Sequence, residues 1–407
     1  MNPLYVGIDV SSKSNVVYLM LPDGSKHSNF SVANSHDGST QLVKRILSTI
    51  TSLSLDTVII GLEATSVYGD NLVYFLREDA TLAQFDKKIH VLNPKQVKNF
   101  KEAYNDLPKN DYVDSYVIAD CLRFGRINKE VYQSDYRYKA LQNLTRASFF
   151  AVQNLVKEKQ RFINVLFKKY STMTQEKVFS DTFSTTALAV YEEFESAEAL
   201  ASMDLQELTD FIMEKGKNRF PDPDSVAKAI QKAARSSYRL PKTVNDSVNQ
   251  VLSISISSIK ALDAQIKEFD KAIKAQMELL PNVLTSIPGI GPVYSAGIIA
   301  EIGDINRFPS QAQLGKYAGL AWTQNQSGDF EAEYTKLIQS GNRFLKYYLC
   351  EGAWSLVRCD TEYSNFYHSK YKEVNRHQHK RALALTARKF VRLVFRLLKD
   401  NRLYVER

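Results

Sequence analysis

The chain has 407 residues, of which 44% are hydrophobic, and it carries a formal net charge of +8. This length predicts two or three domains with apolar cores. No apolar run reaches the ~20 residues of a membrane span, and no secretory signal is evident. The three cysteines, Cys121, Cys350 and Cys359, form no disulfide framework. We therefore predict a cytoplasmic protein without a membrane segment.

The first third of the chain predicts an α/β domain. It begins with an antiparallel meander of three strands and an amphipathic helix, and a continuous apolar run then predicts a fully buried strand. A helix, a short strand and two further helices follow, one opened by a proline and one closed by a glycine. In chain order these elements are expected at 4–10, 15–21, 26–32, 35–50, 56–64, 71–78, 88–93, from Pro94, and at 110–124 up to Gly125.

From about residue 136 helical periodicity dominates. Apolar residues recur every seven positions along one stretch, with two more in the partner positions, which predicts a coiled coil or a helical hairpin. These residues are Leu252, Ile259, Ile266, Ile273 and Leu280, with Leu262 and Phe269 as partners. A helix at about 139–170 is a possible intrachain partner, and a second copy of the chain is the alternative. Residues 171–250 are read as a helical insertion.

The positive charge is unevenly distributed. Residues 137–170 hold eight Lys or Arg against one acidic residue, and residues 371–407 hold eleven against three. Two basic helical stretches favour a polyanionic partner such as a nucleic acid. We predict three regions: an α/β domain at 1–135, a helical region at 136–280, and a mostly helical C-terminal domain at 281–407.

Four carboxylates suggest a metal site in the first region. Asp9 ends the first strand, Glu63 ends the fourth, and Asp111 and Asp114 share one face of a helix. If they converge, Mg²⁺ or Mn²⁺ is the natural ligand, and such ions assist phosphodiester cleavage. Taken singly, each residue is equally explained as a turn former, a cap or an acidic first turn. In this order they resemble the ribonuclease-H-like fold of RuvC-type nucleases.

A competing reading starts from the same strand. The stretch "GIDVSSKSNVVYLMLPDGS" also looks like the first phosphate loop of actin-like ATPases and sugar kinases. That class needs small residues, usually glycine, at Ser11 and Ser12, together with a second phosphate loop and an adenosine motif. The sequence contains neither of these motifs in a suitable place.

The last region contains a second candidate site. "IPGIGPVYSAG" has the pattern of a helix–hairpin–helix, in which Gly289 and Gly291 let backbone amides approach a nucleic-acid phosphate. Arg343 and Lys346 open a basic helix and are further candidates for backbone contacts. Ser327 lies in a polar loop before a glycine. It is a candidate nucleophile, but no nearby histidine is present to activate it. A serine that simply stabilises a turn is the alternative explanation.

Several stretches together resemble the insertion-sequence-110 family of transposases, which is related to Piv-type invertases. They are "GIDVSSKS", "LEATSVYG", "KNDYVDSYVIAD", "SIPGIGPVYSAGIIAEIGDINRF", "YAGLAWTQNQSG", "SGNRFLKYYL" and "KRALALTARKF". The resemblance implies a RuvC-like domain whose DEDD metal site is Asp9, Glu63, Asp111 and Asp114, and a transposase domain in which Ser327 becomes linked to DNA.

The resemblance also implies the partners: donor and target DNA, a noncoding bridge RNA encoded beside the gene, and a homo-oligomer, a dimer or a tetramer. A guide RNA would explain why no helix-turn-helix or zinc finger is evident in the sequence. Two alternatives stay open. One is a structure-selective RuvC-like nuclease without a covalent intermediate, and the other is a nucleic-acid-binding scaffold without activity.

Overall fold

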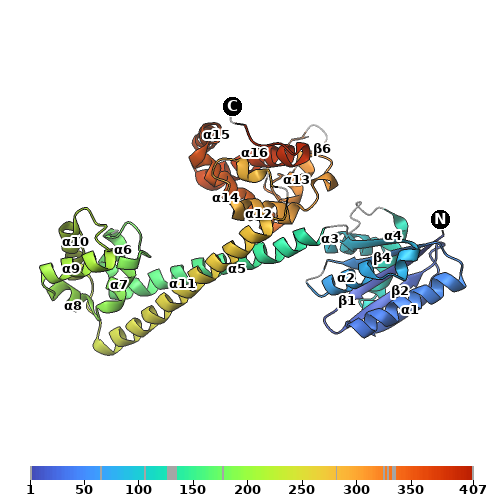
Figure 1. The fold of residues 1–407 in the computed structure, drawn as a ribbon, viewed down its shortest axis with the longest axis horizontal. Helices are drawn as coiled ribbons and strands as arrows, with labels where there is room; N and C mark the ends of the chain where they lie inside the picture. The colour runs from blue at the N-terminus through green and yellow to red at the C-terminus, as the bar shows by residue number, and fades with distance from the viewer. Residues whose placement is uncertain are drawn as a thin grey trace. The chain divides into compact units, whose positions relative to one another are not determined.

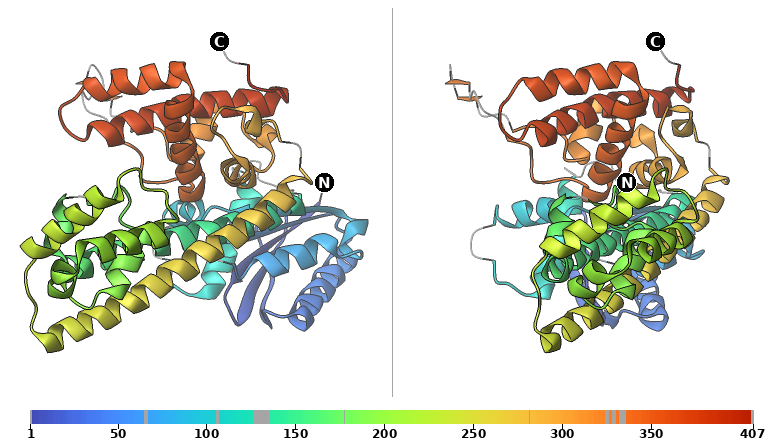
Figure 2. Two further views of the ribbon diagram at one scale, coloured as in Figure 1. Left: turned by 60° about the vertical axis from the view of Figure 1, so that its left-hand side comes forward. Right: turned by 90° about the vertical axis from the view of Figure 1, so that its left-hand side faces the viewer.

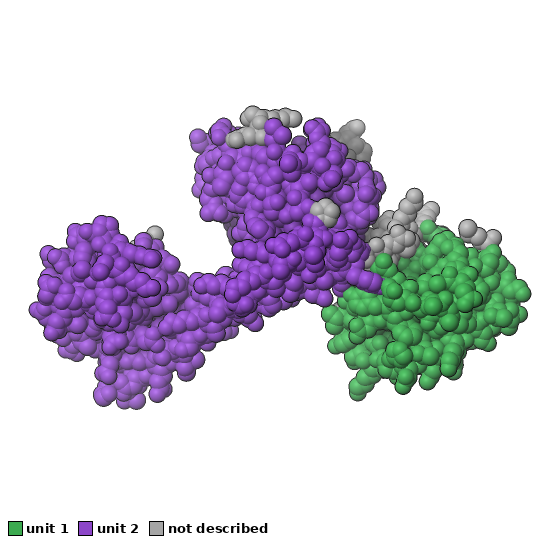
Figure 3. Space-filling view, in the orientation of Figure 1, with its two compact units in different colours: residues 1–134 green, residues 135–407 purple. Residues whose placement is uncertain are grey.

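The computed structural model describes residues 2–64, 67–104, 107–125, 135–176, 178–280, 282–323, 326–327, 330–331 and 336–405, with only the backbone of 326–327 and 330–331. The chain forms two compact units, Met1–Ser134 and Asp135–Arg407 (Figure 3). Each unit is described by itself. No helix in these ranges is both long enough and apolar enough to cross a membrane.

The first unit is built on a mixed five-stranded sheet with the order β3-β2-β1-β4-β5 (Figure 1). The first three strands are antiparallel, whereas β1, β4 and β5 run parallel. This arrangement confirms an α/β domain. Its elements are β1 (Pro3–Val10), β2 (Ser14–Met20), β3 (Lys26–Ala33), α1 (His36–Ser52), β4 (Thr57–Glu63), α2 (Asp70–Glu78), η1 (Leu82–Gln84), β5 (Asp86–Leu92), α3 (Pro94–Lys101) and α4 (Asp111–Phe124).

The two faces of this sheet are covered by different helices. Every second side chain of β1 and β4 points to the face that is covered by α1 and α2. Val6 and Ile60 are examples, and both lie in the core shared with these helices. Tyr5 and Ile59 belong to the other set and pack on α3 and α4. Because successive side chains of a strand point to opposite faces, the position of any residue on β1 or β4 tells which helices it meets.

In its described residues, the second unit has two strands of two residues each, and its other regular elements are helices. Its long helices are α5 (Tyr136–Lys169) and α11 (Lys242–Met277). Between them lie α6 (Ser171–Glu176), α7 (Thr185–Glu193), α8 (Ala197–Ser202), α9 (Leu205–Gly216) and α10 (Pro223–Ser236). After them come η2 (Leu284–Ser286), α12 (Pro292–Ile302), η3 (Ile305–Arg307), α13 (Gln311–Tyr317), β6 (Gln326–Ser327), β7 (Phe330–Glu331), α14 (Arg343–Cys359), α15 (Thr361–Lys372) and α16 (Gln378–Asp400).

Helices α5 and α11 form an antiparallel hairpin and lie side by side in every view (Figures 1 and 2). Leu141 near the start of α5 shares a core with Ile273 near the end of α11. Leu166 near the end of α5 shares a core with Leu252 near the start of α11. The apolar heptads of α11 therefore pack within the chain, which is one of the two alternatives left open by the sequence.

The hairpin joins two helical lobes. Helices α6 to α10 form one lobe, so the predicted helical insertion lies there. The C-terminal lobe comprises the helices from α12 to α16, and its core also includes Leu141, Ile273 and Met277 from the hairpin. The hydrophobic core thus continues across residue 280, where we predict a domain boundary, and that boundary stays a prediction.

Candidate active site

Two acidic residues stand side by side where parallel strands end. Ile8 on β1 is paired with Leu62 on β4, so Asp9 and Glu63 each lie one residue further along. Ile8 and Leu62 are buried in the core that contains α1 and α2. By the alternation of strand side chains, Asp9 and Glu63 face the opposite side of the sheet, which is the side of α4.

A pair of glycines lets α4 lie close to this face. Gly7 and Gly61 are paired in the same register, two residues before Asp9 and Glu63. A Cβ on Gly7 would lie 2.1 Å from the backbone oxygen of Ser115, and a Cβ on Gly61 would lie 2.8 Å from the Leu122 side chain. Only glycine permits this close packing, which brings the first turn of α4 next to the strand ends.

The first turn of α4 contributes two more carboxylates. Asn110 caps the helix by accepting a hydrogen bond from the Val113 N–H, and Asp111 and Asp114 follow within that turn. Asp114 directly precedes Ser115, the residue that contacts Gly7. Asp111 and Asp114 thus lie near enough to Asp9 to influence its charge, and Asp114 lies near enough to influence Glu63. Their joint role as a site stays a prediction.

The electrostatics of this cluster are those of crowded carboxylates. Burial and the nearby charges of Asp114 and Asp111 raise the pKa of Asp9 to about 6. Burial, followed by Asp9 and Asp114, raises the pKa of Glu63. Lys101, the last residue of α3, offsets part of this repulsion, because its Nζ donates to Asp114 Oδ1 at 2.6 Å.

The donor set fits a hard divalent cation. Within the described ranges no three His, Cys, Asp or Glu side chains are gathered in a metal-ligating arrangement. Burial, and after it the neighbouring carboxylates, raise the pKa values of Asp9 and Glu63, while the charge of Lys101 lowers both. Oxygen ligands with excess negative charge are what Mg²⁺ and Mn²⁺ prefer. The four carboxylates are oxygen donors of this kind, and their binding of an ion stays a prediction.

This repulsion predicts a trade-off between stability and function at Asp9. A carboxyl group whose pKa is raised in the folded state binds protons better when folded, so the stability of the unit falls as the pH rises from about 4 to 6 and the loss persists at pH 7. In EDTA at pH 7, Asp9→Asn should increase the free energy of unfolding by on the order of 1 kcal/mol, allowing for solvent screening.

Urea unfolding with EDTA at pH 7 and at pH 4 measures this effect. The difference between wild type and Asp9→Asn should be much smaller at pH 4, where the folded wild-type carboxyl group is almost fully protonated and the unfolded one is about half protonated. Added Mg²⁺ should stabilise the wild type and not the variant. A variant less stable than wild type at pH 7 in EDTA would contradict the account of the cluster.

Ser327 lies in the second unit, on β6. The backbone pairs Ser327 with Phe330 and Gln326 with Glu331 in an antiparallel ladder. The Ser327 side chain and residues 328–329 between the two strands lie outside the described residues. The backbone thus places Ser327 in a short two-stranded segment between Gly319 and Gly341, which we call the arm.

The base of this arm is held by backbone contacts. Thr323 N donates to Lys336 O at 2.8 Å, and Ile338 N donates to Ala321 O at 2.9 Å. Gly319 and Gly341, at the two ends of the arm, have φ values of +71° and +132°. A Cβ on Gly341 would lie 2.5 Å from Gly319 N, so the two chain segments can meet here only because both residues are glycine.

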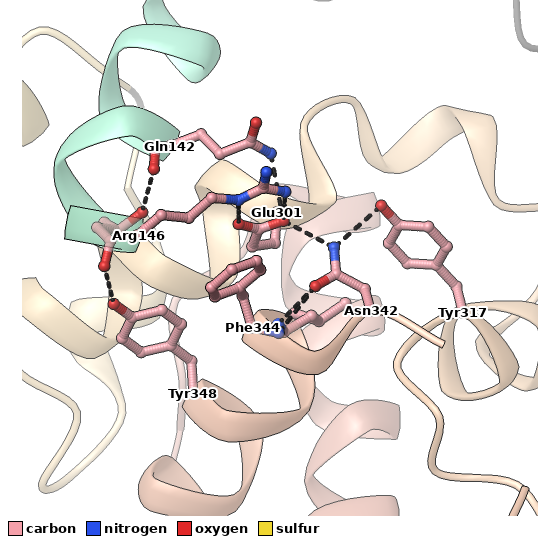
Figure 4. A network of polar contacts seen from close by, with 9 residues as sticks. Gln142, Arg146, Glu301, Tyr317, Asn342, Phe344 and Tyr348 are labelled. Atoms are coloured by element: carbon pink, nitrogen blue, oxygen red, sulfur yellow. Dashed lines mark hydrogen bonds and ion pairs between the residues drawn. The ribbon is translucent and has the colours of Figure 1, made fainter. Parts of the chain in front are cut away.

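A buried carboxylate anchors the segment that leaves the arm (Figure 4). Glu301 at the end of α12 has a fully buried side chain, and its oxygens accept from Arg146 Nε at 2.7 Å and Nη2 at 2.9 Å. Asn342 Nδ2 donates to Glu301 Oε2 at 2.7 Å, while Asn342 Oδ1 caps α14 by accepting from the backbone N–H groups of Phe344 and Leu345. The network fixes the chain directly after the arm.

We expect this network to contribute strongly to stability. Arg146→Met would leave the Glu301 carboxylate buried without its cation, which costs about 3 kcal/mol in comparable sites. Lys271→Met is the control, because the Lys271–Glu268 pair is mostly exposed, and we expect it to change stability by less than about 1 kcal/mol. Urea unfolding of both variants tests this, and equal losses would show that the Glu301 network does not hold the lobe together.

The other candidate nucleic-acid contacts lie in two places. Gly289 has φ +76°, and a Cβ there would lie 2.7 Å from Ser355 Oγ on α14, so this glycine is required by packing. Gly291 has open space around it and precedes α12. The guanidinium of Arg343 lies over the ring of Phe344 at 4.8 Å. Contacts of these residues and of Lys346 with nucleic acid stay predictions.

Sequence reasoning missed two groups of residues. Lys101 belongs to a short helix rich in lysine, and nothing local distinguishes it from Lys98, which pairs with Glu102 on the surface. Glu301 and Arg146 lie 155 residues apart. The available signal was a single acidic residue in the apolar helix "PVYSAGIIAEI", because a carboxylate is seldom buried without a partner.

Comparison with known proteins gives two family matches. A family model for DEDD transposases of IS110 elements, described as "Transposase", matches residues 6–170, which include Asp9, Glu63, Asp111 and Asp114. A second, described as "Transposase IS116/IS110/IS902 family", matches residues 282–368, which include Ser327. Residues 171–281 lie between the two matches.

Individual relatives agree with these matches. The chain is 26% identical to "Insertion element IS116 uncharacterized 44.8 kDa protein" of Streptomyces clavuligerus over 336 residues, which is 80% of each chain. It is 32% identical to "Insertion element IS110 uncharacterized 43.6 kDa protein" of Streptomyces coelicolor over 37% of each chain. It is 28% identical to "Transposase for insertion sequence element IS1111A" of Coxiella burnetii, over 27% of this chain and 31% of that protein.

Proposed function

The chain belongs to the IS110/IS116 family of transposases, and from this membership we propose that it is an RNA-guided recombinase that moves its insertion sequence through a serine–DNA intermediate. The observation that supports the proposal is the placement of Asp9 beside Glu63 at the strand ends, with Asp114 near enough to influence both charges and Asp111 near enough to influence that of Asp9. The sheet order and the position of α4 support a ribonuclease-H-like, RuvC-type domain around them.

The first unit would hold the metal. Asp9, Glu63 and Asp114, whose charges influence one another, would bind Mg²⁺ or Mn²⁺ together with Asp111. When bound, such an ion polarises a phosphate and lowers the barrier to its cleavage. Lys101 orients Asp114 by its hydrogen bond to Oδ1, leaving Oδ2 of that carboxylate for the ion.

The second unit would supply the nucleophile. Ser327 Oγ would attack a DNA phosphorus and lose its proton as the new Oγ–P bond forms. The P–O bond to the DNA strand would break, and the leaving DNA oxygen would take up a proton. One phosphodiester replaces another, so the strand can be resealed by the reverse reaction without a high-energy cofactor. The position of Ser327 on a short strand outside the helices supports this role.

Sequence specificity would come from RNA. The chain has a net charge of +8, and its long helix α5 and its C-terminal helices carry clusters of Lys and Arg that suit nucleic-acid backbones. Base pairing of a noncoding bridge RNA to donor and target DNA would then choose the sites, as it does in other RNA-guided enzymes. We further propose that the active form is a homo-oligomer in which units of different copies cooperate, acting in the cytoplasm.

The test is to express the gene with its native flanking DNA, purify the protein and sequence the RNA that accompanies it. A discrete RNA that maps to one flank supports guidance, and its loops would name the donor and target sequences. Random host RNA alone would contradict guidance and would favour a RuvC-like nuclease. If the affinity for DNA changes neither with Mg²⁺ nor with substitution of any of the five proposed residues, a scaffold without activity is favoured.

A further inference from the structure

The lobe made by α6 to α10 contains a basic groove that the proposed reaction does not use. The groove has a volume of about 620 Å³ and lies between the α8–α9 junction and one face of α10. On one side it is lined by Ser202, Met203, Asp204 and Leu205, and on the other by residues of α10. This volume is within the usual range of sites for ligands of nucleotide size, and it is too small for a double helix.

Three cations line the α10 side at helical spacing. Lys228, Lys232 and Arg235 are four and three residues apart, so they point from the same face of the helix. The three side chains are exposed. Throughout the described ranges, Lys228 and Lys232 have no ion pair or hydrogen bond, so their charges are not consumed by the protein. Along the helix the row spans about 10 Å, the rise of roughly three stacked nucleotides.

The floor of the groove is fixed. Gln231 is buried, and its Nε2 donates to Met203 O at 2.6 Å, which ties α10 to the α8–α9 junction. The Arg235 guanidinium lies 3.5 Å from Gln231 Oε1 and 3.5 Å from Ala201 O, so it is held across the groove. The cations therefore stand on a rigid support.

An aromatic ring follows the row of cations. Tyr238, two residues beyond the groove residue Ser236, has 77% of its surface exposed, although it is a large side chain with an apolar ring. A row of cations followed shortly in the chain by an exposed aromatic side chain suits a surface that binds single-stranded nucleic acid, in which phosphates contact the charges and a base stacks on the ring. An acidic protein partner would not need that ring.

The groove also offers hydrogen-bond acceptors. Asp204 Oδ1 accepts from the Gln206 and Glu207 N–H groups, and within the described part of the chain its Oδ2 has no partner. A carboxylate repels phosphate but accepts a hydrogen bond from a ribose 2′-hydroxyl, which deoxyribose lacks. Asp204 thus favours RNA over DNA in a groove that otherwise attracts both.

We propose that this groove binds an unpaired segment of RNA. Lys228, Lys232 and Arg235 contact its phosphates, Tyr238 stacks on a base, and Asp204 accepts from a 2′-hydroxyl. The inference rests on the proposed function for its RNA partner, and it gives a role to the lobe between the two family matches. It concerns binding alone and involves no covalent step.

The experiment measures binding of the full chain to a labelled oligouridylate of about 12 nucleotides, a length within the site sizes of single-strand binding surfaces. The double variant Lys228→Glu/Lys232→Glu should bind at least ten-fold more weakly, and the slope of log affinity against log salt should fall by about 1.4, because each lost phosphate contact removes about 0.7. Tyr238→Ala should bind roughly five-fold more weakly.

The matched control is Lys267→Glu/Lys274→Glu, which changes the same charge at two exposed lysines of α11. It should change affinity less than two-fold. Oligodeoxyuridylate of the same length should bind more weakly than oligouridylate to the wild type, and Asp204→Asn should narrow that difference. All the substituted side chains are exposed or at the surface of the groove, and thermal unfolding checks that each variant is folded.

A photo-crosslink gives an independent readout. With 4-thiouridine in the oligonucleotide, mass spectrometry should find the crosslink on the peptide that contains Tyr238. Equal weakening by the groove and control variants would overturn the proposal, as would equal binding of the two oligonucleotides or equal competition by polyglutamate. If any of these results is obtained while the flank-encoded RNA still accompanies the wild-type protein, the groove is not the RNA site but the proposed RNA guidance stands. If no such RNA accompanies the wild type, the proposed RNA guidance fails as well.

Discussion

Ser327→Ala should abolish the covalent protein–DNA adduct while leaving RNA binding intact. The substitution removes only the attacking oxygen, and Ser327 lies on a short arm whose base is held by backbone contacts between Ala321 and Ile338. We therefore expect no effect on the helical core. Incubation with labelled donor DNA, followed by denaturing electrophoresis, measures the adduct as a band of protein mass that carries the label.

The matched control is Ser340→Ala, which removes an exposed serine hydroxyl at the base of the same arm. It should form the adduct at the wild-type level. If the adduct persists in Ser327→Ala, the nucleophile is another residue, and Tyr334, which lies outside the described residues, is the first to be tested. Hydrolysed DNA ends with no adduct in the wild type would favour the nuclease alternative.

Asp9→Asn should remove metal-dependent DNA cleavage. Each carboxylate lost from the site weakens metal binding and the stabilisation that the ion gives to the transition state, which is worth several kcal/mol. A loss of about 4 kcal/mol corresponds to a rate roughly 1,000-fold lower. We expect the same direction for Asp114→Asn, and single-turnover cleavage over a range of Mg²⁺ concentrations measures both.

Asp37→Asn is the control for this series. Asp37 is in the first turn of α1, and its side chain is 96% exposed, whereas the proposed site lies on the face of the sheet covered by α4. It should cleave at the wild-type rate. A wild-type rate in Asp9→Asn or in Asp114→Asn would contradict the assignment of the metal site.

The positions of the four carboxylates on their strands and helix were predictable because they depend on local rules. A strand that ends in Asp, a buried strand that ends in Glu and a helix with acids three apart are visible in the sequence, and parallel strands end at one edge of a sheet. The pairing of Gly7 with Gly61 could not be predicted, because it requires the register of β1 and β4. Lys101 was missed because its approach to Asp114 depends on how α3 packs.

The heptads of α11 show a different limit. The repeat predicts an apolar seam, but a seam does not say which helix covers it. In the structure α5 of the same chain covers it, since Leu252 and Ile273 are buried in cores shared with that helix. Gly289 is similar: its sequence context predicts close approach, and the structure shows approach to Ser355 on α14.

The most direct measurement is to digest the wild-type protein–DNA adduct with protease and nuclease and to locate the remaining nucleotide by mass spectrometry. We predict a single modified peptide whose nucleotide is attached to Ser327 through a phosphodiester. A nucleotide on another residue, or no modified peptide from a reaction in which the DNA has been cut, would contradict a serine transposase mechanism.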